Sequence, residues 1–248
     1  MRILTYILFF SVIAFTACKK SEDRRCFKSA GEDAERIEVI DLPFDSLFLY
    51  DNIIYNLIPD TLNKVVFSAG ENLLNFAELE VENNRLTVRN QNRCNFLRSY
   101  QKKITATIHF EDLNYIYFQG SEALTTLDTL RSSNFRMLIR DGAGSVNLLV
   151  NQGYTSIVVT HGYGDFTVKG KSVIAFLNCF TNSYCDATEF NVSDRLVVSS
   201  NTQGDMHVKA DGIKLEAQTF RGGNIISRGV PSELEYEQHG SGELILEN

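Results

Sequence analysis

The chain has 248 residues, of which 44% are hydrophobic, and its formal net charge is −7. This apolar content is too high for a disordered chain, and the length suffices for a large core. Lys and Arg form no cluster along the sequence. The mild acidic excess therefore argues against a nucleic-acid partner, whose phosphates require clustered cations.

The first residues are typical of an export leader. Arg2 precedes an apolar run from Ile3 to Phe15, which is too short to span a bilayer and fits a signal peptide. The run ends in Phe15-Thr16-Ala17-Cys18, which resembles a bacterial lipobox. We expect a lipoprotein signal peptide over residues 1–17 and lipid attachment, including palmitate, at Cys18. The alternative is an ordinary cleaved signal followed by an unrelated cysteine.

Residues 18–35 are polar and read as a lipidated tether. Lys19, rather than Asp, follows the cysteine, which in lipoproteins of this kind implies the outer membrane. Glu22 and Asp23 resemble the acidic surface-export signal of Bacteroidetes lipoproteins. The expected location is therefore the outer membrane, on its periplasmic or cell-surface face, with the membrane as a partner through the lipid anchor.

Residues 36–112 predict an N-terminal β region. Short runs rich in β-branched and aromatic residues alternate with polar turns. Glu82–Arg85 is expected to be the turn of a hairpin between Leu79–Val81 and Leu86–Val88. No stretch of twelve residues has a strong amphipathic helical pattern, so we predict an all-β chain whose first part forms either rungs or a cap.

Residues 113–248 repeat a glycine corner about every twenty residues. The motif is clearest in Gly162-Tyr163-Gly164-Asp165-Phe166. The residue after the second glycine recurs as Ser145, Asp165, Asp186, Asp205, Asn224 and Glu243. Glycine precedes each of these except Asp186, which follows Cys185. A fixed period in this range is the signature of stacked repeats, here a β-solenoid with rungs of about 20 residues.

Backbone geometry offers a reason for the corner. A sharp turn between two strands often needs a positive φ, which glycine adopts without steric cost. Asp and Asn suit the next position because their side chains bond nearby backbone N–H groups.

Several motifs together resemble one known family. They are Asp112–Ser121, Gly142-Ala143-Gly144-Ser145, Gly162-Tyr163-Gly164-Asp165 and Gly240-Ser241-Gly242-Glu243-Leu244. In order and spacing they are similar to the head GIN domain family of Bacteroidetes, which is described as an auto-transporter adhesin family. The likeness runs from about Ile37 to the last residue. The resemblance implies a right-handed β-helix on a lipid-anchored envelope protein without an established activity.

Four cysteines remain once Cys18 is set aside. Cys26 and Cys94 could form a disulfide that pins the tether to the domain. Cys179 and Cys185 could bridge one corner or remain as two buried thiols. No Cys-x-x-Cys pair or matching His spacing indicates zinc, and no cofactor is expected.

The corner acids permit three interpretations. In-register stacking would place Asp165, Asp186, Asp205 and Glu243 in a carboxylate ladder that could hold a hard cation such as calcium. Two of these acids with His161 or His239 could instead serve as acid and base on a polysaccharide. The favoured interpretation is structural, because Asp and Asn form corners without any ligand.

We therefore expect a non-enzymatic, adhesin-like envelope module whose flat face binds a glycan or a protein, or which serves a structural role. Tyr154, Tyr163 and Tyr184 could stack on sugars. The alternative is a glycan-cleaving β-helix enzyme, either a polysaccharide lyase or a hydrolase. A lyase should show a cluster of Asp, Lys and Arg on one strand face of adjacent rungs, whereas Lys169, Lys171 and Arg195 are scattered without a shared register. This argues against the enzyme, and no catalytic residues are assigned.

Overall fold

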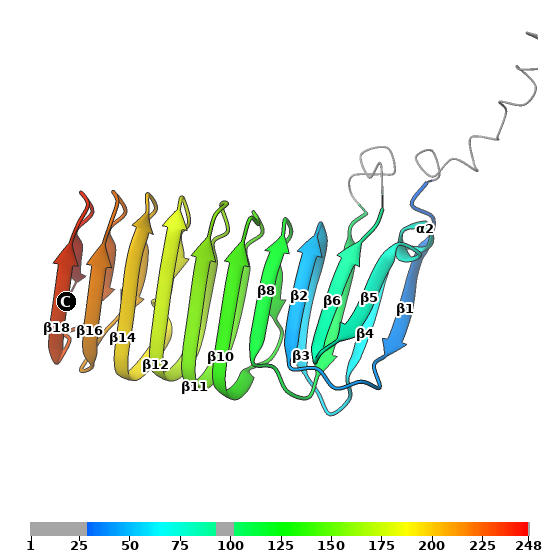
Figure 1. Ribbon diagram of the computed structural model, residues 1–248, viewed down its shortest axis with the longest axis horizontal. Coiled ribbons are helices and arrows are strands. Elements are labelled where there is room, and N and C mark those ends of the chain that lie inside the picture. The colour runs from blue at the N-terminus through cyan, green and yellow to red at the C-terminus, as the bar shows by residue number, and fades with distance from the viewer. Residues whose placement is uncertain (1–28, 93–101, 248) are drawn as a thin grey trace, which may run out of the picture.

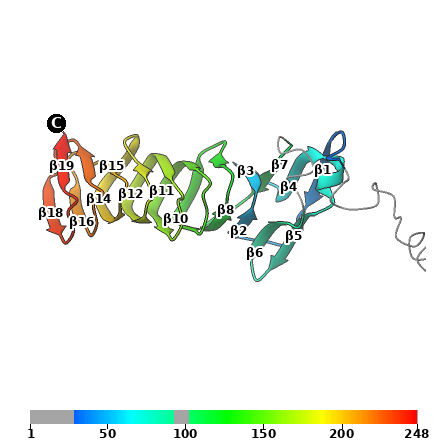
Figure 2. The same ribbon diagram turned by 90° about the horizontal axis from the view of Figure 1, so that it is seen from above.

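The computed structural model describes residues 29–92 and 102–247. Within these residues, nineteen strands form one continuous sheet that curls into a β-solenoid, with one turn of helix, α2 (Glu71–Leu74), at its N-terminal end (Figure 1). Viewed from above, the strands form two long layers around the core (Figure 2). The expected all-β solenoid is confirmed. Within the described ranges no helix is both long and apolar enough to cross a membrane.

The N-terminal strands do not stack in chain order. They are β1 (Asp33–Val39), β2 (Ser46–Asp51), β3 (Ile53–Pro59), β4 (Lys64–Gly70), β5 (Ala77–Glu82), β6 (Arg85–Asn90) and β7 (Ile104–Phe110). β2 pairs in parallel with β6 and with β8 (Tyr115–Gly120), while β3 pairs in parallel with β7 and with β9 (Leu124–Thr126). The rung made by β2 and β3 therefore lies between two rungs that follow it in the chain. Figure 1 shows blue β2 between β8 and β6.

Antiparallel strands close the N-terminal end of the solenoid. β4 runs antiparallel to both β1 and β7, and β5 runs antiparallel to β6. Asn83 and Asn84 turn the β5–β6 hairpin with φ of 53° and 60°, values that Asn tolerates better than most residues. The expected hairpin turn is confirmed. Strands β1 to β7 thus supply both an antiparallel cap and two of the rungs.

The remaining strands stack in chain order. They are β8 (Tyr115–Gly120), β9 (Leu124–Thr126), β10 (Leu130–Arg140), β11 (Val146–Thr160), β12 (Phe166–Thr181), β13 (Cys185–Asp186), β14 (Phe190–Thr202), β15 (Met206–Lys209), β16 (Lys214–Thr219), β17 (Ile225–Arg228), β18 (Glu233–Gln238) and β19 (Leu244–Glu247). All pairings among them are parallel. The long strands β10, β11, β12 and β14 run from one layer into the other.

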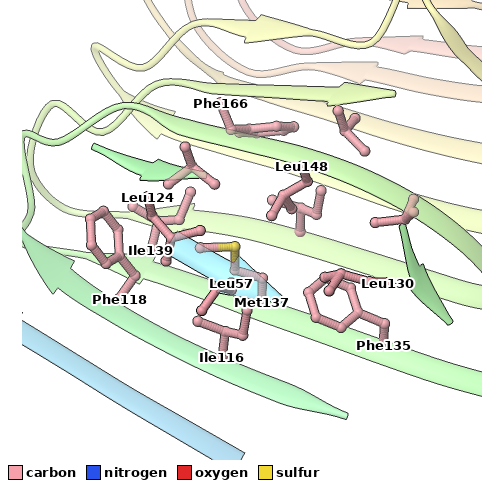
Figure 3. Close-up of a cluster of buried hydrophobic side chains, with 14 of the residues drawn as sticks. Leu57, Ile116, Phe118, Leu124, Leu130, Phe135, Met137, Ile139, Leu148 and Phe166 are labelled. Carbon is pink, nitrogen blue, oxygen red and sulfur yellow. The ribbon is translucent and has the colours of Figure 1, made fainter. Parts of the chain in front are cut away.

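The core consists of inward side chains stacked in rows. Strand alternation points Ile116 and Phe118 inward, and the register places Ile116 beside Met137 and Phe118 beside Ile139 (Figure 3). The ring of Phe118 meets that of Tyr55 edge-on at 6.3 Å. Each fully buried side chain of this size contributes about 1.5–3 kcal/mol. Each interior rung thus buries its apolar face on its neighbours.

The second corner glycine serves close approach rather than a left-handed backbone, which corrects our expectation. None of the corner glycines of this type has a positive φ: Gly144, Gly164, Gly204, Gly223 and Gly242. A Cβ at Gly223 would lie 2.2 Å from the carbonyl oxygen of Gly204, and a Cβ at Gly144 would lie 1.9 Å from that of Glu122. The left-handed conformation belongs instead to the first glycine of one corner, Gly162, with φ of 91°.

Asp186 does not lie in the row of corner residues, so that part of the repeat assignment is wrong. Tyr184 takes the place instead, and its carbonyl oxygen accepts the N–H of Phe166 at 3.1 Å. Asp186 lies two residues further along, opposite Thr167. The observed row runs through Ser145, Asp165, Tyr184, Asp205, Asn224 and Glu243.

Two local features explain the misread spacing. Ser183, which is fully buried, stands where the other corners have glycine, so this corner lacks its marker. The register then shifts at a bulge, because Ser172 pairs with Val192 whereas Ile174 pairs with Arg195. β14 therefore holds one residue more than β12 over this interval.

The C-terminal end of the described solenoid exposes its last rung. β18 pairs with β16, and all six of its residues are exposed. The inward-row side chains Leu234 and Leu246 are 43% and 45% exposed. Outward from the same strand project three glutamates, which we call the acidic edge: Glu233, Glu235 and Glu237. Charges on an edge strand oppose pairing with further strands.

Candidate binding face

Aromatic side chains gather on the outer side of the sheet where β2 and β8 lie side by side. Phe48 and Tyr50 alternate with inward Leu49 on β2, and the register places Phe48 opposite Tyr117. The rings of Phe48 and Tyr117 stack with centroids 5.3 Å apart. Tyr50 lies 5.6 Å from Tyr117, and Tyr115 lies 5.7 Å from Phe48. The four rings form one continuous strip.

Arginines of the adjoining strands border this strip on both sides. On β6, the guanidinium carbon of Arg85 lies 4.8 Å from the ring centroid of Phe48, and that of Arg89 lies 4.0 Å from Tyr50. Each such cation–π contact contributes about 0.5–1 kcal/mol at an exposed site. On β10, Arg136 pairs with Tyr115, and Arg140 is exposed at the end of the same strand. We call this surface the aromatic face; it comprises Phe48, Tyr50, Tyr115, Tyr117, Arg85, Arg89, Arg136 and Arg140.

Part of the ring surface is already in contact within the strip, because Arg85 lies over Phe48, Arg89 lies over Tyr50, and Phe48 and Tyr117 stack on each other. All four rings are half-buried. Burial raises the pKa of Tyr115 and of Tyr117, so both hydroxyls stay protonated at neutral pH. Amphipathic tyrosines and arginines of this kind dominate contact surfaces in many complexes.

A groove of about 430 Å³ opens beside the aromatic face, at the ends of β2 and β8. It is lined by Tyr50, Asp51, Arg89, Gln119, Gly120, Ser121, Asp141, Gly142 and Ala143. Gln119 accepts the hydroxyl of Tyr117 at 3.1 Å, so the groove and the strip share one hydrogen-bond network. The guanidinium of Arg89 and the carboxylates of Asp51 and Asp141 thus lie at one edge of the aromatic face.

The corner residues accept hydrogen bonds from the following rung. Asp165 Oδ1 accepts the N–H of Tyr184 at 2.7 Å, and Asp205 Oδ1 accepts the N–H of Asn224 at 2.9 Å. Asn224 Oδ1 in turn accepts the N–H of Glu243 at 3.0 Å. These bonds account for Asp and Asn in the row without a ligand, as the structural interpretation holds.

Asp186 accepts the N–H and the hydroxyl of Thr188 at 3.0 and 2.7 Å. Burial alone would raise the pKa of Asp186, but these hydrogen bonds lower it. The suggested cation ladder thus loses one of its four members, while Asp165, Asp205 and Glu243 stay in one row. Among residues 29–92 and 102–247, no group of three or more His, Cys, Asp or Glu side chains could hold a metal ion.

The histidines considered for acid–base chemistry lie apart from the corner row. The ring of His239 stacks on Phe220 at 4.7 Å, and its Nε2 lies 3.3 Å from Glu237. His161 is exposed with φ of 51°. Neither contacts a corner acid within the described part of the chain.

Of the three tyrosines proposed for sugar stacking, two lie at corners and one lies in the sheet. Tyr163 and Tyr184 project from corners and are 66% and 40% exposed. Tyr154 lies in the sheet, where the guanidinium of Arg136 approaches its ring to 5.8 Å. Of the three, Tyr154 adjoins the aromatic face.

Cys179 and Cys185 are fully buried free thiols, which was one of the two alternatives. Burial raises the pKa of the Cys185 thiol, and its hydrogen bond with Cys179 adds to this effect. Cys18, Cys26 and Cys94 lie outside the described residues, so lipidation and the suggested disulfide stay predictions.

Sequence reasoning missed the aromatic face because its parts come from distant segments. The alternation in Phe48-Leu49-Tyr50 and in Tyr115-Ile116-Tyr117 does carry a signal, since it sends the rings to the side opposite the core. These rings lie side by side only because β2 inserts between β6 and β8, and no local sequence pattern predicts that insertion.

Comparison with known families identifies the chain over most of its length. The family model described as "putative auto-transporter adhesin, head GIN domain" matches residues 43–231. The chain belongs to this family. No curated protein matches it at a significant level.

Solved structures share the fold at low sequence identity. A putative adhesin from Bacteroides fragilis is 19% identical with a TM-score of 0.79, and the match covers 87% of this chain and 97% of that one. A putative adhesin from Parabacteroides distasonis is 16% identical with a TM-score of 0.64, covering 88% and 98%. A putative lipid binding protein from the same species is 14% identical with a TM-score of 0.63, covering 88% and 98%. These likenesses show that the chain has the same fold, and they do not identify a ligand.

Proposed function

We propose that this head GIN protein is a lipid-anchored module of the cell envelope that binds a ligand through its aromatic face. Its membership in an adhesin family supports a role at the envelope or cell surface. The lipobox-like Phe15–Cys18 supports lipid attachment at Cys18, and Lys19 after the cysteine supports the outer membrane as its location. In this role the protein catalyses no reaction.

The strip of four rings bordered by arginines is the observation that carries the proposal. The strip is half-buried and continuous over β2 and β8. Tyr and Arg contribute disproportionately to binding energy at interfaces. In the corner row, by contrast, the side-chain oxygens of Asp165, Asp205 and Asn224 accept backbone N–H groups of the following rung.

Attachment of cells that produce the full chain to immobilised mucin tests the binding role. Replacing Tyr50 and Tyr117 by alanine should reduce attachment at least about tenfold, because each tyrosine at a contact centre contributes 1 kcal/mol or more. Tyr163→Ala with Tyr184→Ala is the matched control, since these exposed rings lie at corners. Equal attachment by cells with and without the protein would contradict the adhesin-like role.

Metabolic labelling with an alkyne analogue of palmitate tests the anchor. The wild-type chain should carry label and sediment with outer membranes, whereas the Cys18→Ser variant should lose both properties. Label retained in the variant would contradict lipid attachment at Cys18.

A further inference from the structure

The groove beside the aromatic face combines charged donors and acceptors at one site. Arg89 supplies a guanidinium, while Asp51 and Asp141 supply two carboxylates. Gln119 and Ser121 add an amide and a hydroxyl. Arg89, Asp51, Ser121 and Asp141 are all exposed, so their polar groups can reach a ligand without a rearrangement of the core.

Each of these side chains keeps hydrogen-bonding capacity. Asp51 uses Oδ2 for the N–H of Asn90 at 2.9 Å. Asp141 places Oδ2 at 3.3 Å from Nε of Arg140. Both carboxylates therefore have a second oxygen whose contacts within the described residues leave it open to a ligand, as a carboxylate has about four acceptor sites.

The Arg89 guanidinium is held in place by a ring rather than by an acid. It lies 4.0 Å from the centroid of Tyr50, and no ion pair to it occurs within the described part of the chain. A guanidinium stacked in this way keeps its N–H donors in the plane of the group. Those donors can point into the groove while Tyr50 fixes the plane.

This chemistry fits a polyhydroxylated ligand better than an anion or a peptide. Two carboxylates would repel an anion, and one guanidinium cannot offset both. A peptide anchor needs a desolvated apolar pocket, whereas this groove is lined, apart from Tyr50, by glycine, alanine and polar or charged side chains. Sugar hydroxyls both donate and accept, so adjacent hydroxyls can bond a carboxylate and the guanidinium at once.

We propose that the groove is a saccharide subsite that binds one unit of an uncharged glycan through Asp51, Asp141, Arg89 and Gln119. The volume of about 430 Å³ lies within the range of small-molecule pockets. From the groove the glycan would continue over the hydroxyls of Tyr50 and Tyr117. This inference rests on the proposed binding role of the aromatic face and names its ligand class.

A glycan array of envelope and mucin-type oligosaccharides, probed with the full chain carrying Cys18→Ser, tests the subsite. Binding of the strongest oligosaccharide is then titrated with Asp51→Asn and Asp141→Asn. Asn preserves the side-chain shape and tolerates the left-handed backbone at these positions, where φ is 64° and 53°. Asp165→Asn is the matched control, because Asn224 already fills the equivalent corner.

Each groove variant should weaken binding about tenfold or more, since a hydrogen bond to a charged group contributes about 1.5–3 kcal/mol. The control should bind as the wild type does. Equal binding by Asp141→Asn, Asp51→Asn and wild type would overturn the subsite. The subsite would also be overturned if no glycan on the array bound while attachment to mucin still required Tyr50 and Tyr117. That result would point to a protein ligand, and the binding role of the aromatic face would remain.

Discussion

Gly223→Ala should destabilise the solenoid by about 2–4 kcal/mol. The new Cβ would lie 2.2 Å from the carbonyl oxygen of Gly204 and 2.9 Å from that of Thr202. Both atoms belong to the backbone of the neighbouring rung, so no side chain can rotate to make room. Relief requires the two rungs to separate by about 1 Å, the shortfall from an ordinary carbon–oxygen contact.

Such a separation would break the hydrogen bonds around the corner. The N–H of Gly223 donates to Thr202 O at 3.0 Å, that of Met206 donates to Asn224 O at 2.9 Å, and that of Asn224 donates to Asp205 Oδ1 at 2.9 Å. Each bond contributes about 0.5–1.5 kcal/mol. Three of them together give the expected loss, which also agrees with the usual cost of overpacking.

Urea unfolding followed by far-ultraviolet circular dichroism measures this loss. Gly212→Ala is the control, because a Cβ there has no neighbour within 4 Å and only the left-handed backbone, with φ of 70°, is strained. That strain costs about 1–2 kcal/mol. A free energy of unfolding lowered less by Gly223→Ala than by Gly212→Ala would refute the close-approach explanation of the corner glycines.

Three further predictions concern the thiols, the acidic edge and one surface carboxylate. Because Cys179 and Cys185 are buried and burial raises the pKa of Cys185, iodoacetamide should alkylate them only after unfolding; alkylation of the folded protein, seen by peptide mass spectrometry, would contradict their burial. Replacing the acidic edge by three glutamines should promote concentration-dependent end-to-end association in sedimentation velocity, since like charges opposite one another oppose strand pairing; an unchanged sedimentation coefficient would speak against this protective role. The N–H of Thr61, and then His109, lower the pKa of Asp60 from its usual 3.8. A lowered pKa in the folded state adds stability above the unfolded pKa and loses it as the pH falls through the folded one. The difference in the free energy of unfolding between wild type and Asp60→Asn, measured in urea, should therefore shrink below about pH 4. A difference that does not change with pH would contradict the lowered pKa of Asp60.

The repeating architecture could be predicted because it is local. Alternation decides which side of a strand is buried, as with inward Ile116 and outward Tyr117, and a constant period stacks like positions above one another. The same locality predicted the Asn83–Asn84 hairpin turn. Where each rung repeats its neighbour, a short window of sequence contains the information needed.

The misassigned corner and the aromatic face could not be predicted, because both arise where the chain departs from the regular period. Ser183 in place of glycine removed the marker of one corner, and the extra residue of β14 between Val192 and Arg195 lengthened the next interval. Asp186 therefore looked equivalent to Asp165, although Tyr184 holds that place. The insertion of β2 between β6 and β8 is a long-range pairing, and it assembles the aromatic face. Period and alternation carry no signal for such pairings, so the binding face could be recognised only in three dimensions.

Hydroxyl-radical footprinting of the full chain, with and without its envelope or mucin ligand, tests the binding face most directly. Tyrosine oxidation read by mass spectrometry reports each ring separately, and Tyr163, at 66% exposure, serves as an internal reference. Ligand should protect Tyr50 and Tyr117 and leave Tyr163 and Tyr184 unchanged. Protection of the corner tyrosines with no change at Tyr50 and Tyr117 would contradict the aromatic face as the site of binding.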